Sequence, residues 1–249
     1  MAVGVVNRGS LRDVGFLAAT VRLLAQSLVV ENSEQMALSC TALAAMCTGN
    51  DANKEAAMAV EGVAEGVPCG ALWILVELLR RHKGSGLQAE GLAALRALVL
   101  EDDGRKVDAV PCAVQNRELL LSEEVYPQVT LILAEAVHLE ASSKLTEQIL
   151  LLLREVARGE GIKELAKQHL SYVRRCLVCP EPRLVRASLA VLRAFAFCED
   201  VRDELSLSCE TKVYIQAVRE HLGTPVVCEQ GFGLLANLTL RLSEASRNV

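Results

Sequence analysis

Hydrophobic residues recur along this chain at spacings of three and four, which is the period of a helix with one buried face. Leu92, Leu95 and Leu98 keep this spacing in one segment, and Leu189 and Leu192 keep it in another. The alternation of apolar and polar residues that marks a half-exposed strand is missing. The pattern therefore predicts an all-α protein.

One short motif returns five times: a leucine, two variable residues and a second apolar residue, followed in most copies by a polar or acidic turn. The copies begin at Leu43, Leu95, Leu153, Leu192 and Leu235. The leading leucines lie 52, 58, 39 and 43 residues apart, near the roughly 40 to 47 residues of known helical repeats. We attribute the longest interval to an insertion within Glu101–Ser122 and the next longest to a connector at Gly62–Gly66.

A second apolar helix is expected before each copy of the motif. These second helices are predicted at Val14–Val30, Gly70–His82, Glu124–His138, His169–Val178 and Thr211–Leu222. Ala52–Glu61 and Gly161–Gln168 are predicted to form short first helices, as in three-helix repeats. The chain is therefore expected to be one repeat domain with approximate repeats 11–50, 51–103, 104–160, 161–200 and 201–249.

Residues at the predicted helix ends have capping chemistry. Ser33 and Ser143 are expected N-caps, because a serine hydroxyl accepts a hydrogen bond from a free backbone N–H. His82, His138 and His221 each end a predicted second helix, where a partly protonated imidazole interacts favourably with the helix dipole. This capping role explains these histidines without catalysis.

Composition narrows the possible partners and compartments. Of the 249 residues, 51% are hydrophobic and 23% charged, with 31 acidic against 26 basic side chains, so the chain repels a phosphate backbone and no nucleic acid is expected. Nine cysteines scattered through apolar segments favour reduced thiols and a cytoplasmic or nuclear location. Arg22 interrupts the apolar stretch Val14–Val30, so we expect a soluble protein without a signal peptide or membrane span.

The last copy of the motif carries a family resemblance. Gly233–Arg241 reads Gly-Leu-Leu-Ala-Asn-Leu-Thr-Leu-Arg, which is similar to the third-helix consensus of the armadillo-repeat family. That resemblance implies a right-handed α-solenoid, armadillo-like or HEAT-like, whose third helices line a concave groove for partner proteins. It also implies a scaffold that is not an enzyme and needs no cofactor.

Importin-like members of the family clamp an extended peptide with a tryptophan and, four residues later, an asparagine on each third helix. The matching pairs in this chain are Thr41 and Ala45, Ala93 and Ala97, Leu151 and Glu155, Ala190 and Ala194, and Gly233 and Asn237. Only Asn237 keeps the family residue, and the single tryptophan, Trp73, lies on a second helix. A nuclear transport adaptor is therefore the weaker alternative.

Although the tryptophan–asparagine pairs do not recur, arginine recurs at one position of the motif. Arg96, Arg154 and Arg193 each follow the leading leucine of their repeat, which predicts a basic ladder along the edge of the groove. Arginine binds carboxylates in a bidentate manner, so we expect a protein or peptide partner with acidic side chains. The simpler interpretation is that these arginines are solvated and cover neighbouring repeats with their aliphatic stems.

Cysteine and histidine chemistry is the alternative from a different functional class. Cys176 and Cys179 have the spacing of a zinc or redox pair, and both His169 and Cys198 would have to complete a closed four-ligand site. A second pair is missing, so we interpret Cys176 and Cys179 as small apolar neighbours on one helical face. Neither catalytic nor metal-binding residues are predicted, and the acidic run Glu101–Asp103 is expected to be a solvated turn.

The end of the chain leaves an apolar surface to be covered. Leu234, Leu238 and Leu242 lie on the last predicted third helix, and the end of a solenoid must be polar or covered. We expect either a longer repeat protein or burial by self-association or another protein. The overall prediction is an interaction scaffold that binds its partner through Arg96, Arg154, Arg193 and Asn237.

Overall fold

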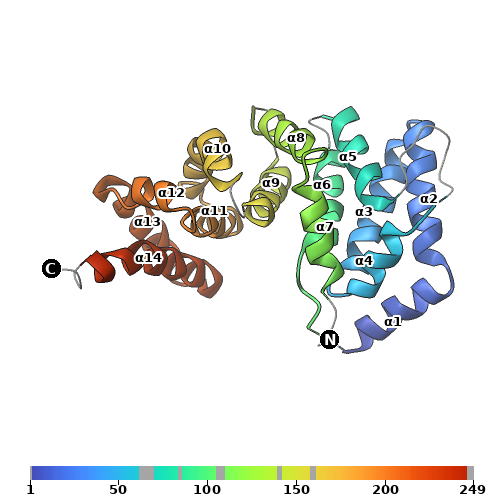
Figure 1. Cartoon of the computed structure of the whole chain (residues 1–249), viewed down its shortest axis with the longest axis horizontal. Helices are drawn as coiled ribbons and strands as arrows, with labels where there is room; N and C mark the ends of the chain where they lie inside the picture. Colours follow the sequence, from blue (N-terminus) through green and yellow to red (C-terminus); the bar gives the residue numbers. More distant parts are fainter. Residues whose placement is uncertain are drawn as a thin grey trace. The chain divides into compact units, whose positions relative to one another are not determined.

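The computed structural model in Figure 1 describes residues 2–61, 70–83, 86–104, 110–138, 142–157 and 161–245. Regular structure within these ranges is entirely α-helical, which confirms the predicted fold class. The chain divides into two compact units, unit 1 at Met1–Glu140 and unit 2 at Ala141–Val249. None of the described helices is long and apolar enough to cross a membrane.

Unit 1 consists of successive helices that follow the three-helix repeat. Their bounds are α1 (Ala2–Asp13), α2 (Phe16–Val29), α3 (Ser33–Cys47), α4 (Asp51–Met58), α5 (Ala71–Arg81), α6 (Gly86–Val99), α7 (Cys112–Leu120) and α8 (Tyr126–His138). Helices α1, α4 and α7 occupy the place of a short first helix. The expected insertion within Glu101–Ser122 is therefore wrong in part, because α7 begins directly after Pro111 and supplies a first helix.

Unit 2 departs from the three-helix pattern at one point. Its helices are α9 (Ser143–Val156), α10 (Ile162–Leu177), α11 (Pro182–Phe195), α12 (Glu199–Leu205), α13 (Ser208–Glu220) and α14 (Pro225–Ala245). The predicted separate helices at 161–168 and 169–178 are wrong, because α10 runs through both. Neither glycine nor proline interrupts Ile162–Leu177, so nothing in the local sequence breaks the helix.

The third helices pack directly on one another within each unit. Helix α3 contacts α6 in unit 1, and α11 contacts both α9 and α14 in unit 2. Four of the five leading leucines, Leu43, Leu95, Leu153 and Leu192, have no exposed surface. Leu235 is only half-buried, whereas its neighbour Leu234 is completely buried.

The expected apolar surface at the end of α14 has different members from those predicted. Leu234 and Leu238 are buried rather than uncovered, and Leu242 lies outside the residues whose side chains are described. Among the side chains of α14 that the structure describes, the large apolar ones that are exposed are Val226 and Phe232.

The helix caps differ slightly from the predicted positions. Asn32 caps α3 by accepting from the N–H of Gln35, and Ser142 caps α9 by accepting from the N–H of Leu145. The predicted caps Ser33 and Ser143 are therefore each one residue too late. His82 and His221 directly follow the last residues of α5 and α13, as predicted.

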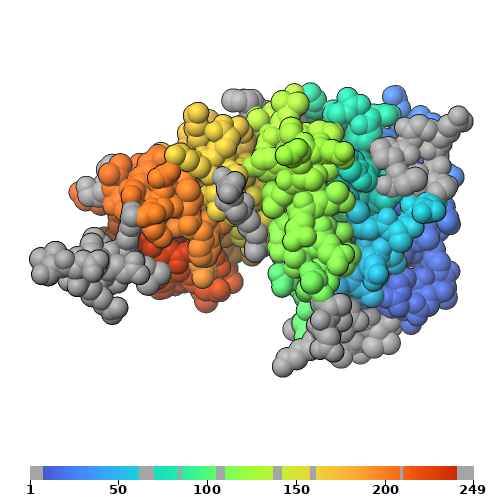
Figure 2. All heavy atoms as spheres, in the orientation of Figure 1, coloured from blue at the N-terminus to red at the C-terminus, as the bar shows by residue number. Residues whose placement is uncertain are grey.

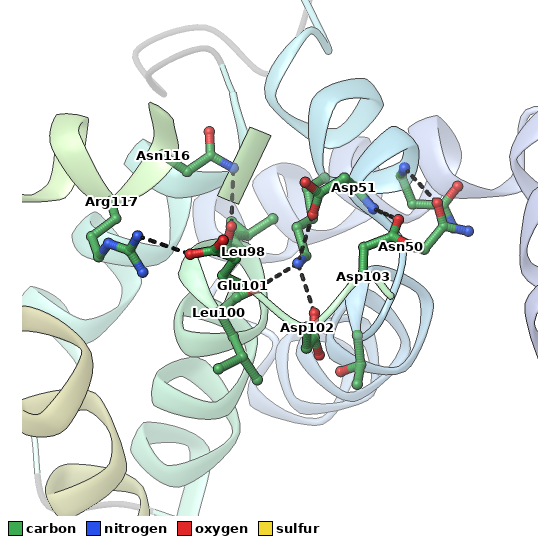
Figure 3. Close-up of polar contacts among 12 residues, drawn as sticks. Asn50, Asp51, Leu98, Leu100, Glu101, Asp102, Asp103, Asn116 and Arg117 are labelled. Carbon is green, nitrogen blue, oxygen red and sulfur yellow. Dashed lines mark hydrogen bonds and ion pairs between the residues drawn. The ribbon is translucent and has the colours of Figure 1, made fainter. Parts of the chain in front are cut away.

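A buried lysine joins the turns of neighbouring repeats in unit 1. Lys54 on α4 is fully buried, and its Nζ pairs with Asp51 at 3.0 Å and with Asp102 at 2.8 Å. The Nζ also donates to the carbonyl oxygen of Leu100. Figure 3 shows these three acceptors converging on one nitrogen. The predicted solvated turn at Glu101–Asp103 is therefore wrong for Asp102 and Asp103, whose carboxylates bind α4. The Glu101 side chain is 54% exposed, as predicted.

Further polar contacts surround this lysine. Asp103 accepts from the backbone N–H of Asp51 at 2.8 Å, and Asn53 donates to the carbonyl of Met46 at 2.9 Å. On α7, Asn116 donates to the carbonyl of Leu98 at 3.1 Å (Figure 3). Helix α4 lies against α7, cyan beside green in Figure 2. We call this set the Lys54 network.

Replacing Lys54 with methionine is expected to destabilise unit 1 by about 3 kcal/mol, because removing one partner of a buried ion pair leaves the others uncompensated. Trp73 is the only tryptophan of the chain and lies on α5, so its fluorescence during urea unfolding reports on unit 1. The matched control is Lys163→Met, whose ion pair with Asp200 has side chains 69% and 65% exposed. That change should leave the Trp73 transition in place, and equal midpoints for all three proteins would contradict a stabilising role for Lys54.

Candidate partner-binding face on the third helices

The third helices of unit 2 leave a narrow exposed strip, which we call the third-helix face. Its described exposed or half-exposed members on α9, α11 and α14 include Glu147, Arg154, Arg186, Arg193, Ala194, Glu229, Gly233 and Asn237. Several positions matched to the family's peptide clamp are not open: Leu151, Glu155 and Ala190 are buried. A partner on this face would therefore meet mainly charged and small side chains.

Arg193 lies close to the neighbouring helix at a glycine. A Cβ atom built on Gly233 of α14 would lie 2.8 Å from Cζ and 2.8 Å from Nε of Arg193. A side chain at this position would push the end of Arg193 aside, so the guanidinium occupies space that glycine leaves free. Arg193 is half-buried and forms no ion pair with any described acidic side chain. The result is a positioned positive charge without a carboxylate from the described chain.

Asn237 lies one helical turn beyond Gly233 on the same helix. Its Nδ2 is 3.4 Å from the carbonyl oxygen of Arg193, so the amide supports α11 while its side chain stays half-exposed. Arg193 and Asn237, which come from repeats predicted separately, therefore lie next to each other.

Arg154 has a different environment although its motif position is the same. Its Nε donates to Oε1 of Glu155 at 2.8 Å, and Glu155 is nearly completely buried. This contact neutralises Arg154 within its own helix. The stack also contains an ion pair that the sequence did not reveal, between Arg186 of α11 and Glu147 of α9 at 3.1 Å.

Arg96 lies on α6 in unit 1 and is half-buried. On the neighbouring third helix, Thr41 of α3 donates to Glu90 of α6 at 3.3 Å. Trp73 is on α5, a second helix, as predicted. Of the three arginines of the predicted ladder, Arg96 belongs to unit 1, whereas Arg154 and Arg193 lie on α9 and α11 of unit 2, which pack together.

A mid-helix glycine is the signal that could have identified the Arg193 contact. Glycine inside a helix costs stability relative to alanine, so its presence indicates a close approach. Gly233 stands in the middle of α14, but a single sequence does not say which side chain approaches it.

The cysteine pair lies at the end of α10 and not on a third helix. Cys176 is a buried residue in the last turn of α10, and burial raises the pKa of its thiol to about 11. A reactive cysteine needs the opposite shift. Within the described residues, no three side chains of histidine, cysteine, aspartate or glutamate are grouped so as to hold a metal ion.

Comparison with known sequences gives two related proteins. The chain is 26% identical over 243 residues to armadillo repeat-containing protein 6 of Pongo abelii, a match that covers 91% of this chain and 46% of that protein. The human protein of the same name is 26% identical over 246 residues, with 92% and 46% coverage. The chain thus spans about half the length of these curated relatives. No protein-family profile matches it.

Solved structures agree with this relationship at the level of fold. An engineered protein superposes with a TM-score of 0.67 at 19% identity, covering 94% of this chain and 85% of its own. A designed armadillo repeat protein in complex with the peptide (KR)4 superposes with a TM-score of 0.66 at 15% identity, covering 93% and 85%.

Alkylation with iodoacetamide should separate the cysteines by their environments. Burial raises the pKa of Cys40 and Cys47 to about 12, so at pH 8 these thiols, like Cys176, are almost entirely protonated. At a pKa of about 11 roughly one thiol in a thousand is ionised at pH 8. Timed peptide mapping of the native protein should find Cys179, which is half-exposed, labelled well before Cys176. Faster labelling at Cys176 would instead indicate an activated thiol.

Proposed function

Because this chain is an armadillo-repeat protein, we propose that it is a scaffold that binds another polypeptide along the third-helix face. The fold is consistent with a protein-binding scaffold, and we assign the contact to Arg193, with Asn237 beside it. The observation that carries this assignment is the unneutralised guanidinium of Arg193 packed against Gly233. Arg154 and Arg96 are proposed as secondary contacts.

The chemistry of Arg193 favours a carboxylate on the partner. A guanidinium presents its N–H donors in a planar fork that fits a carboxylate with two parallel hydrogen bonds. Gly233 leaves room for that fork against α14. We therefore propose an extended peptide that places an aspartate or glutamate at Arg193.

Charge on the neighbouring helix limits how acidic the partner can be. Glu229 is exposed one turn before Gly233 on α14, and a continuous acidic run would place a second carboxylate near it. Separated acidic residues fit this face better than a block of them. The designed armadillo repeat protein that superposes on this chain carries the basic peptide (KR)4, so the proposal assigns the opposite charge to the partner in this protein.

The alternative function, a nuclear transport adaptor that clamps a basic nuclear signal peptide, has less support. The clamp needs several asparagines free to bind peptide backbone, and Asn237 is the only one at the matching positions. Its amide already lies within 3.4 Å of the Arg193 carbonyl. We also assign no catalytic role, since the raised pKa of the Cys176 thiol works against nucleophilic chemistry.

Fluorescence anisotropy with a labelled octapeptide of alternating aspartate and alanine tests the proposal. Arg193→Glu should weaken binding about tenfold or more, since a charge-assisted contact worth about 1.4 kcal/mol corresponds to a factor of ten. Gly233→Ala should weaken binding several-fold without changing charge, because its methyl group displaces the flexible end of Arg193. Arg154→Glu should have a smaller effect than Arg193→Glu, since Glu155 already neutralises Arg154.

Arg219→Glu is the matched charge control, because Arg219 is exposed on α13. Circular dichroism melting of each variant checks that the fold is retained. Binding that is unchanged by Arg193→Glu, or a lysine–alanine peptide that binds more tightly than the aspartate–alanine peptide, would refute the assignment.

A further inference from the structure

A second concave site lies in unit 2 between α10 and α12, apart from the third helices. The cavity has a volume of about 390 Å³, which is within the roughly 300 to 1,000 Å³ of typical ligand pockets. Helices α10 and α12, gold and orange in Figure 2, lie against each other on the face shown. Its walls come from one side of α10 and from the short helix α12.

Ion pairs join the two helices at either end of this cavity. Lys163 contacts Asp200 at 2.7 Å, and Arg174 contacts Glu204 at 3.2 Å. Lys163 and Arg174 are about 16 Å apart along the axis of α10, at 1.5 Å per residue. Arg174 also pairs with Glu210 of α13 at 2.9 Å, so both end cations are neutralised.

Lys167 lies between these two pairs and has no such partner. It is exposed, and no described carboxylate forms an ion pair with it. Glu164, the acidic residue one turn before it on α10, accepts a hydrogen bond from Gln168 at 3.1 Å. The cavity lining contains three basic and two acidic side chains, and Glu210 adds a second carboxylate at Arg174. Lys167 is therefore the cation of this site that has no ion-pair partner among the described residues.

The remaining lining gives the site an apolar base and one further donor. Ala166, Leu170 and Val201 line the base of the cavity and are otherwise buried, at 2%, 5% and 4% exposed, so a short aliphatic chain that enters the cavity would contact them. Ser171 is exposed one turn beyond Lys167 on α10 and lines the same cavity. A ligand that combines a carboxylate with a few methylene groups would satisfy Lys167, Ser171 and this base together.

We propose that the α10–α12 cavity binds a glutamate side chain of a partner polypeptide, with its carboxylate on Lys167 and Ser171 and its methylenes on Leu170 and Val201. A single negative charge on the ligand would pair with Lys167. A dianion such as a phosphate monoester is disfavoured, because Asp200 and Glu204 flank the site and repel a second charge. The proposal does not depend on the third-helix face.

Methyl-detected NMR of the full chain provides the test, with a blocked pentapeptide that carries one central glutamate between alanines as the probe. The methyl signals of Leu170 and Val201 should shift in a saturable way. The glutamine counterpart should bind about tenfold more weakly, since it lacks the ionic contact. A phosphoserine counterpart should also bind more weakly than the glutamate peptide.

Lys167→Met should abolish the saturable shifts, and Lys167→Arg should largely retain them. Lys212→Met is the matched control, because Lys212 is exposed on α13 and does not line the cavity. Arg193→Glu should leave the shifts unchanged, which separates this site from the third-helix face. Equal binding of the glutamate and glutamine peptides, tighter binding of the phosphoserine peptide, or normal shifts in Lys167→Met would each overturn the proposal.

Discussion

Stacking of third helices is the constraint on which the candidate site depends. Helix α11 lies between α9 and α14 and also contacts α10, so most of its surface is used for packing. Leu189 and Leu192 are completely buried there. What remains for recognition is one strip along the helix, and Arg193 is one of the few long side chains on it. The apolar burial that stabilises the repeats therefore also determines which residues are available for function.

Much of the helical organisation could be predicted from the sequence, because apolar spacing and repeat length are local signals. The five leading leucines marked all five third helices, and four of these leucines are buried as expected. The errors came from connectors. Helix α7 lies within a segment interpreted as an insertion, and α10 joins two segments interpreted as separate helices. Both signals were present in the sequence. A proline precedes the start of α7, and neither glycine nor proline occurs within α10.

The candidate site was less predictable, since side chains with equivalent motif positions have different neighbours in space. Arg154 precedes Glu155 and is neutralised by it, whereas Arg193 lies against Gly233, forty residues away in the chain. The acidic run at Glu101–Asp103 looked like a solvated turn because its partner, Lys54, is distant in sequence. Spacing identifies the helix that carries a residue, but tertiary contacts determine whether its charge is already satisfied.

A comparison of the charged groups then distinguishes structural from binding roles. Lys54 has three oxygen partners and is fully buried, so its charge stabilises unit 1 and is not available to a partner. Arg193 and Lys167 each lie beside ion pairs of unit 2 but have no carboxylate of their own among the described residues. Other ion pairs already join the helices of unit 2, so neither Arg193 nor Lys167 is needed for stability in the way that Lys54 is. A positive charge without an ion-pair partner attracts a carboxylate from outside the chain, because the electrostatic gain does not require a pair within the protein to be broken.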